Sequence, residues 1–148
     1  MGAIEILRSH RRIMLDTSPF IYFIEQHQKY FEITDEIFKL IRDDFSLSAF
    51  SSIVTLVEVL TQPLKENNSK IAEKYRHLLL HSENFTTYSI DSIIAEKAAV
   101  LRARYDLKTP DALQLATAIE NNATMFITND SNLKKVKEIE ILVLKDYL

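Results

Sequence analysis

The amino-acid sequence predicts an α/β protein in which a mostly parallel sheet of about five strands is covered by helices on both faces. Short apolar runs alternate along the chain with longer segments of helical periodicity, which is typical of parallel strands joined by crossover helices. A single Gly and three Pro leave few interruptions to helices. With 148 residues the chain has a common domain size and can bury its own core, so we expect one domain over residues 1–148.

The first half of the chain predicts two strands and four helices. Residues 12–15 are an apolar run that predicts a buried strand. Ser18 and Pro19 then predict a helix start, with Ser18 as the cap and Pro19 in the first helical position. That helix continues to residue 26, and residues 30–43 form an amphipathic helix. A strand over 45–50, a helix that ends before Pro63 and a helix over 70–81 complete this half, and Ser51 or Ser52 caps the first of these two helices.

The second half predicts three strands and two helices. Residues 85–90 alternate and are rich in β-branched side chains, which predicts a strand. Asp91 is the expected cap of a helix that runs to residue 105, and Thr109 is the expected cap of a helix that ends near residue 121. Apolar runs over 125–128 and 139–144 predict the last two strands. In such sheets the ligand site lies at the carboxyl ends of the strands, where Asp16 and Asp130 are expected.

Composition excludes several kinds of site. The chain has no Cys, which leaves oxygen or imidazole as metal ligands and favours Mg²⁺ or Mn²⁺ over structural Zn²⁺. No apolar run approaches the roughly 20 residues that span a bilayer, and residues 1–12 do not have the pattern of a signal peptide, so we expect a cytoplasmic protein. The net charge of −3 neither supports nor excludes RNA as a partner.

Four acidic residues lie where separate predicted elements begin, end or turn: Asp16, Glu58, Asp111 and Asp130. Each has an ordinary structural explanation as well. Asp16 and Asp130 suit turns, and Asp111 gains stability from the dipole of its helix. Glu58 belongs to a polar stripe that either faces water or lines a cleft. Carboxylates from distant points of a chain repel one another unless a cation holds them, and an acidic cluster around a divalent metal is the usual equipment for hydrolysing a phosphodiester.

In chain order the four acids occur as strand-Asp-Thr, helix-Glu, Thr-Pro-Asp-Ala and strand-Thr-Asn-Asp, and this ordered set resembles the PIN-domain nucleases. The likeness is greatest to the small stand-alone members, including the VapC-type toxins of toxin–antitoxin pairs. It extends from Ile13 to Leu148, and its most specific parts are residues 94–113 and 126–130. The resemblance implies a three-layer α/β/α sandwich and a Mg²⁺- or Mn²⁺-dependent endoribonuclease that leaves 5′-phosphate and 3′-hydroxyl ends.

The resemblance also implies the residues of the site. All four acids form the catalytic and metal-binding set, with Asp16 and Asp111 assigned to direct coordination of the cation. Glu58 and Asp130 bind a second ion or hold metal-bound waters, and one of them serves as the base. The neighbouring polar residues Thr17, Thr128 and Asn129 are expected to orient the carboxylates or a phosphate.

Two features depart from the commonest members of that family. Gln114 stands three residues after Asp111, where many relatives carry His. Residues 1–11 precede the first strand as an N-terminal extension, whereas many relatives start almost at the strand. Both bear on substrate preference and partner contacts more than on the acidic set.

Basic residues form three clusters in the sequence, and each either binds phosphate or is a solvated face. The third cluster follows Asp130 closely, so Lys134 and Lys135 are the preferred RNA contacts. His77 and His81 have a spacing able to bind a metal, but a solvent-facing helix explains them better. The other clusters are Arg8, Arg11 and Arg12, and Arg102, Arg104 and Lys108. The aromatic residues Phe20, Tyr22, Phe23, Tyr30, Phe31 and Phe38 are expected in the core or a subunit interface.

The sequence leaves three classes of function open. The main one is an RNA-cleaving toxin that forms a homodimer, acts on RNA and is inhibited by a small antitoxin protein. The second is a PIN-like module that binds RNA or protein without catalysis, which the complete set of four acids disfavours. The third is a phosphoacceptor domain built on Asp16, but it leaves Glu58 and Asp111 unexplained.

Overall fold

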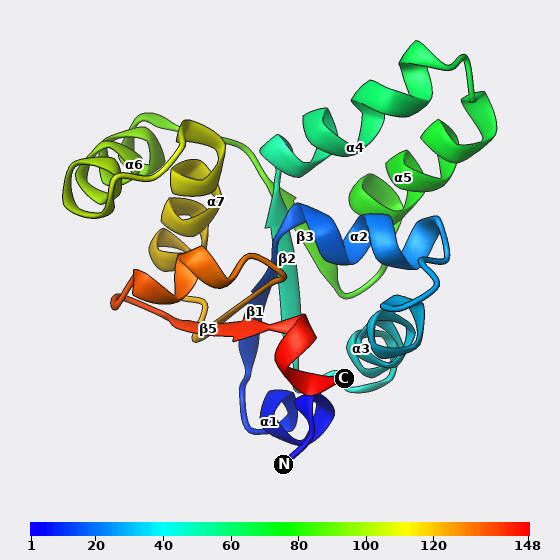
Figure 1. Ribbon diagram of the computed structural model, residues 1–148, viewed down its shortest axis with the longest axis horizontal. Coiled ribbons are helices and arrows are strands. Elements are labelled where there is room, and N and C mark those ends of the chain that lie inside the picture. Colours follow the sequence, from blue (N-terminus) through cyan, green and yellow to red (C-terminus); the bar gives the residue numbers. More distant parts are fainter.

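Five parallel strands form one sheet in the order β3-β2-β1-β4-β5, which confirms the predicted α/β class (Figure 1). The structure is a computed structural model that describes all residues, 1–148. The strands are β1 Arg12–Leu15, β2 Ser48–Ser52, β3 Phe85–Tyr88, β4 Met125–Thr128 and β5 Glu140–Val143. Predicted and observed bounds coincide for β1 and β4, which lie side by side in the middle of the sheet.

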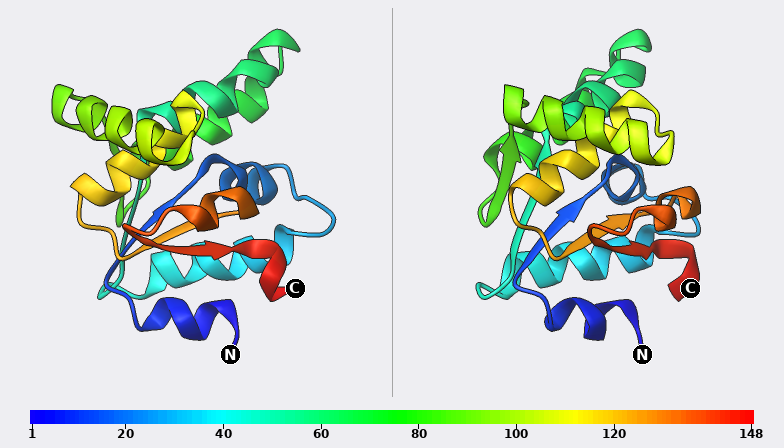
Figure 2. Two further views of the ribbon diagram at one scale, coloured as in Figure 1. Left: turned by 60° about the vertical axis from the view of Figure 1, so that its left-hand side comes forward. Right: turned by 90° about the vertical axis from the view of Figure 1, so that its left-hand side faces the viewer.

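Helices cover both faces of the sheet, as predicted. Helices α6 and α7 lie on one face, and α2 to α5 lie on the other (Figures 1 and 2). None of the helices combines the length and apolarity needed to cross a membrane. The α-helices are α1 Ala3–Arg8, α2 Thr17–Ile24, α3 Phe31–Asp43, α4 Ile53–Lys65, α5 Ser69–His81, α6 Ser92–Tyr105 and α7 Thr109–Glu120, and two 3-10 helices follow, η1 Ser131–Lys135 and η2 Leu144–Tyr147.

Alternate residues of the strands divide the interior into two cores. In β1, Ile13 and Leu15 point into the core beneath α1 to α5, whereas Met14 points into the core beneath α6 and α7. Phe126 joins Met14, while Ile127 joins the first core. This period of two follows from the pleat of a strand, and burial on both faces explains why the central strands read as unbroken apolar runs.

Residues before the first strand form helix α1, which the sequence did not predict. Ala3 and Leu7 are buried in the first core, and Figure 2 shows α1 packed at the opposite end of the molecule from α4. A helix this short has marginal stability alone, so its packing against the core stabilises it.

The start of β2 and the end of α4 differ from the predictions by three residues each, for identifiable reasons, and the other predicted strand and helix boundaries differ by at most two residues. Strand β2 begins at Ser48, and Phe45 is 83% exposed, because residues 44–47 form a turn in which Asp44 accepts hydrogen bonds from Ser46. Helix α4 continues through Pro63 to Lys65. The missing N–H of Pro63 costs only one hydrogen bond in this last turn, its ring is buried, and its carbonyl accepts from the backbone N–H of Asn68 at 2.8 Å.

Helix starts also differ in detail from the predictions. Asp16, rather than Ser18, is the N-cap of α2, and the Ser18 hydroxyl is buried without a hydrogen-bond partner. Lys108, rather than Thr109, is the N-cap residue of α7. The predicted side-chain caps Ser52 of α4 and Asp91 of α6 are confirmed.

Arg12 ties the amino end of β1 to three other elements. Its guanidinium donates to the carbonyl of Asn121 at 2.5 Å, to Ser48 Oγ at 3.1 Å and to the Tyr88 hydroxyl at 2.7 Å. The guanidinium carbon also lies 4.6 Å from the ring centroid of Phe50. Arg12 is therefore a structural residue at the edge of the sheet opposite the strand ends that carry the acids.

We expect Arg12→Lys to lower the free energy of unfolding by about 2–3 kcal/mol, because a lysine cannot reproduce the fork of donors or the stacking. Urea unfolding of both proteins measures the difference. Arg11→Lys is the matched control, since Arg11 is exposed, and its effect should stay within about 0.5 kcal/mol. An equal, small effect of both changes would contradict the structural role of Arg12.

Candidate active site

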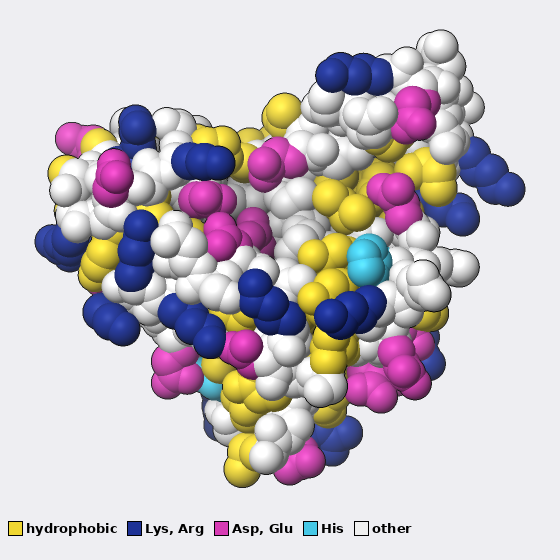
Figure 3. Space-filling view, viewed as in Figure 1, with side chains coloured by type: hydrophobic (Ala, Val, Ile, Leu, Met, Phe, Trp, Pro, Cys, Tyr) yellow, Lys and Arg dark blue, Asp and Glu magenta, His cyan; other side chains and the backbone are white.

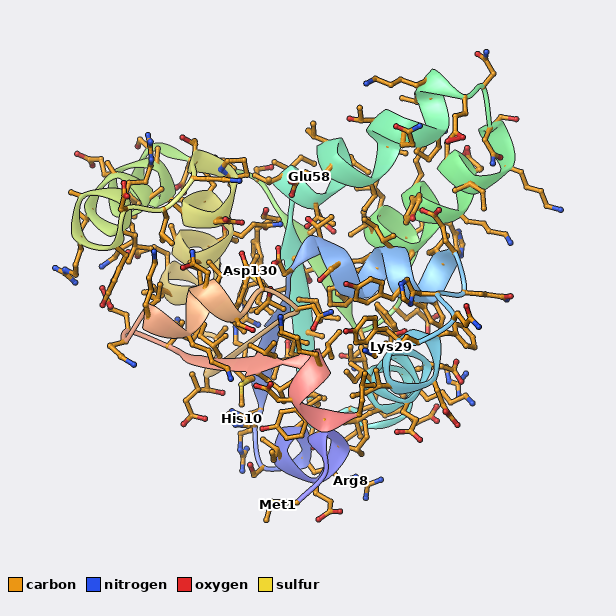
Figure 4. The ribbon with its side chains drawn as sticks, in the orientation of Figure 1. Met1, Arg8, His10, Lys29, Glu58 and Asp130 are labelled. Carbon is orange, nitrogen blue, oxygen red and sulfur yellow. The ribbon has the colours of Figure 1, made fainter.

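The four acids lie at the carboxyl edge of the central strands, as the topology predicts. Asp16 follows β1 directly, Asp130 follows β4 by two residues, Asp111 is in the first turn of α7, and Glu58 is in α4. Figure 3 shows acidic side chains gathered in the hollow between the arm formed by α4 and α5 and the arm formed by α6 and α7. Figure 4 places Glu58 on α4 at the top of this hollow and Asp130 below it. We call these four residues the acidic group.

Asp16 is held in place by two hydrogen bonds. Its Oδ1 accepts the backbone N–H of Thr17 at 2.8 Å, and its Oδ2 accepts the hydroxyl of Thr128 at 2.7 Å. Burial raises the pKa of Asp16 from 3.8 to about 6; the two hydrogen bonds oppose this rise, and the charges of Asp111 and Glu58 add to it. The two hydrogen bonds thus fix the orientation of the side chain, but they only partly offset the cost of burying its negative charge.

The remaining acids are coupled to Asp16 and to one another. Burial raises the pKa of Asp111, and the charges of Asp130 and Glu58 raise it further, while Lys108 opposes them. Glu58 and Asp130 are exposed to solvent. Each of the four therefore either raises the pKa of another member or has its own pKa raised, so the group carries mutual repulsion.

The donors suit a hard divalent cation, although no three carboxylates or imidazoles stand close enough together to hold a metal ion as they are. All four side chains offer oxygen, which Mg²⁺ and Mn²⁺ prefer. A cation would neutralise the repulsion that raises the pKa values of Asp16 and Asp111. The chemistry of the group therefore fits such an ion.

Two of the three predicted neighbours, Thr17 and Thr128, bond directly to the acids, whereas the prediction for Asn129 was wrong. Thr17 Oγ1 donates to Glu58 Oε1 at 2.7 Å, which joins the start of α2 to α4. Thr128 Oγ1 donates to Asp16 and accepts the backbone N–H of Asp130 at 3.1 Å, so one hydroxyl links two acids. Asn129 points away from them: it donates to the Tyr22 hydroxyl at 3.0 Å and accepts the backbone N–H of Lys145 at 2.9 Å.

Sequence reasoning missed the polar cluster beneath the acidic group. In the sequence, Gln114 stands out only because many relatives carry His at its position. In the structure it is buried and hydrogen-bonded to Ser52, Thr55 and Thr17. A Gln among Ala and Leu on the buried side of a helix is a signal in itself, because a buried amide needs partners for all its polar atoms.

The basic side chains have structural partners in several cases. Lys134 pairs with Asp146, and Lys135 is half-buried, so the predicted RNA contacts of these two residues stay a prediction. Arg104 pairs with Glu138, and Arg102 donates to the carbonyl of Leu107. The charge available for phosphate is therefore smaller than the sequence suggests.

Other residues singled out in the sequence lie away from the acids. His77 and His81 are on the exposed side of α5, which agrees with a solvent-facing helix. Phe20 is fully buried, and the other aromatic residues named in the sequence are half-buried. Phe38 packs against both Phe20 and Phe23, at ring-centroid distances of 5.5 and 4.5 Å, and Tyr22 stacks on Tyr30 at 4.6 Å. A cavity of about 730 Å³ between α1 and α3 contains no member of the acidic group.

We expect Asp16→Asn to raise the free energy of unfolding of the metal-free protein by on the order of 3 kcal/mol above about pH 7. This is the free energy that corresponds to the rise in the pKa of Asp16 on folding. Asn keeps the helix cap. Well below pH 3.8, Asp16 is protonated in both the folded and the unfolded protein, so the advantage disappears. Wild type loses stability as pH rises through the interval from 3.8 to about 6. Urea unfolding in EDTA across this pH range measures the difference in free energy of unfolding between the variant and wild type. A difference that does not change with pH would contradict a raised pKa of Asp16.

Comparison with solved structures shows the same fold. A toxin–antitoxin complex from Klebsiella pneumoniae contains a chain with 22% identity and a TM-score of 0.67, over 88% of this chain and 96% of that chain. A chain of VapBC2 from Rickettsia felis, bound to a DNA fragment from its promoter, has 18% identity and a TM-score of 0.68, over 89% of this chain and 98% of that chain.

A third structure is VapC20 from Mycobacterium tuberculosis, described as a toxin that cleaves the sarcin-ricin loop. It has 14% identity and a TM-score of 0.69, over 86% of this chain and 98% of that chain. No curated protein matches the sequence. The family model of the PIN domain matches residues 13–139, from β1 almost to β5. The chain therefore belongs to the PIN-domain family.

Proposed function

We propose that this protein is a divalent-metal-dependent endoribonuclease. The observation that carries the proposal is the acidic group: four carboxylates from four elements lie at the carboxyl edge of the sheet, and burial, followed by their mutual repulsion, raises the pKa of Asp16 and Asp111. A protein has little structural use for such an arrangement, because each raised pKa lowers stability near neutral pH. Perturbed carboxylates in a cleft are typical of a site that binds a cation.

Asp16 and Asp111 would hold the cation, Mg²⁺ or Mn²⁺. Bound there, the cation supplies Lewis acidity toward the phosphodiester and neutralises the carboxylates. Glu58 and Asp130 are exposed, so either carboxylate can accept the proton of an attacking water. The water oxygen joins phosphorus, the bond from phosphorus to O3′ breaks, and O3′ takes up a proton. The products carry 5′-phosphate and 3′-hydroxyl ends.

We further propose that the protein is the toxin of a toxin–antitoxin pair and acts in the cytoplasm. Support comes from the folds of toxin chains in solved complexes, which resemble this chain over nearly its whole length. A small antitoxin would then cover the acidic group, and a homodimer is the expected assembly. Residues 1–148 would form one PIN-like domain that includes α1, since α1 shares the first core.

We expect purified wild type to cleave a mixed RNA pool with Mn²⁺ or Mg²⁺ and not with EDTA. Asp111→Asn should lower the cleavage rate by about 100-fold or more, because it removes a charge that holds the cation. Gel analysis of RNA ends, with the two proteins purified in parallel, measures both effects.

Asp106→Asn is the matched control for this change. Asp106 is an exposed acid five positions earlier, and it caps α6 in the left-handed conformation, which Asn adopts readily. It should cleave like wild type. Equal activity of Asp111→Asn and wild type would refute the nuclease assignment, whereas Mn²⁺ binding without cleavage would favour a narrow RNA substrate.

The toxin proposal predicts that expression of wild type arrests bacterial growth, because cleaved RNA cannot be translated. Asp130→Asn should relieve the arrest at equal protein level, since it removes one member of the acidic group. Colony counts with an inducible promoter, together with immunoblots, measure the outcome. Growth arrest that persists in the variant would contradict a toxic effect through the nuclease site.

A further inference from the structure

We propose that Gln114 is a positioning residue of the nuclease site, whose amide directs the hydroxyl of Thr17 toward Glu58. The proposal rests on the proposed function for its catalytic meaning, and on the hydrogen bonds of the metal-free protein for its structural meaning. Gln114 touches none of the four acids, so it acts through Thr17.

Gln114 uses every polar atom of its side chain. The residue is 1% exposed, on the side of α7 that faces β2 and α4. Its Oε1 accepts the Ser52 hydroxyl at 2.5 Å. Its Nε2 donates one hydrogen to Thr55 Oγ1 at 2.7 Å and the other to Thr17 Oγ1 at 3.2 Å. A buried amide with this set of partners has one favourable orientation.

The Gln114 amide and the Glu58 carboxylate fix the direction of the bonds to Thr17. An amide nitrogen only donates, so Gln114 occupies one lone pair of Thr17 Oγ1 and one of Thr55 Oγ1. A carboxylate only accepts, so the proton of Thr17 points to Glu58 Oε1 at 2.7 Å. The Ser51 hydroxyl lies 3.1 Å from both Thr55 Oγ1 and the carbonyl of Leu15, so its single proton does not set the direction of the 3.1 Å contact between Thr55 and Thr17.

The orientation of the amide decides what Thr17 can do. With the amide reversed, Oε1 would face the two threonine hydroxyls and would attract the proton of Thr17 away from Glu58. The Ser52 hydroxyl opposes that reversal, because it donates its proton to Oε1 at 2.5 Å and would face the amide nitrogen, which cannot accept it, in the reversed orientation.

Glu58 needs this donor more than an ordinary surface carboxylate does. It is exposed on α4, its hydrogen bond comes from Thr17, and it repels Asp16 and Asp111. Without the bond, repulsion favours rotamers that point away from the other acids. The cluster thus joins α7, the β2–α4 junction and the start of α2, the elements that carry or adjoin three of the acids.

The test uses Gln114→Met, which keeps the length of the side chain and removes its hydrogen bonds. We expect Mn²⁺ affinity, measured by calorimetry, to fall about tenfold, and kcat for RNA to fall by a similar factor with KM unchanged. In a Glu58→Gln background the same change should have no further effect on Mn²⁺ affinity, because the residue through which it acts is already altered.

Thr117→Val is the matched control on the same helix. Thr117 is fully buried, its hydroxyl donates to the carbonyl of Leu113 at 2.8 Å, and it has no bond to the cluster. It should lower thermal stability without changing Mn²⁺ affinity. If Gln114→Met behaves like Thr117→Val, or if its effect is the same in wild type and in the Glu58→Gln background, the positioning role is refuted.

A second measurement separates this proposal from the nuclease assignment. In metal-free protein, Glu58→Gln should shift the side-chain amide resonances of Gln114 in ¹⁵N spectra, and Thr117→Val should shift them less. If wild type neither cleaves RNA nor binds Mn²⁺ and this shift is present, the nuclease assignment fails and the link through Thr17 stands. If wild type cleaves RNA and Glu58→Gln leaves the resonances in place, the link through Thr17 fails.

Discussion

The half-buried carboxylate of Asp16 is the constraint to which the rest of the site is adjusted. Its position directly after β1 gives α2 its cap, and the same carboxylate accepts the hydroxyl of Thr128 from the neighbouring strand. These bonds offset only part of the cost of burial, since the pKa still rises to about 6. The site is therefore well ordered and electrostatically unfavourable at once, which is the state that a cation would relieve.

Residues that stabilise the parallel sheet lie at the amino ends of its strands, and the acidic group lies at the carboxyl ends. At the amino ends Arg12 closes the sheet with hydrogen bonds and ring stacking, and α1 packs nearby in the first core. At the carboxyl ends the helix starts supply N–H groups, hydroxyls and acids. All five strands run in the same direction, and β1 pairs with β4. The residues that follow these two strands therefore lie at the same edge of the sheet although they are far apart in the sequence.

Local patterns predicted most of the fold, whereas the four members of the acidic group were singled out by their order along the chain and the family resemblance that this order carries. The apolar runs of β1 and β4, and the cap Asp91, are each specified by a few adjacent residues, and the structure agrees with them. The end of α4 depended on tertiary packing of Pro63, which a local rule for proline cannot include. The role of Gln114 depends on hydroxyls from α2, β2 and α4, so no segment of the sequence contains the pattern.

Protons and cations are alternative ways to relieve the same repulsion. Asp16, with a pKa of about 6, is largely ionised at neutral pH. Its negative charge is then stabilised by its hydrogen-bond donors or by a bound ion. The network beneath the site acts on the same balance, because a hydroxyl that donates to Glu58 stabilises an anion that the other acids destabilise. Replacing Gln114 with an apolar residue would leave buried hydroxyls unpaired as well as removing that support. The buried polar cluster around Gln114 thus helps to keep the exposed carboxylate of Glu58 in place.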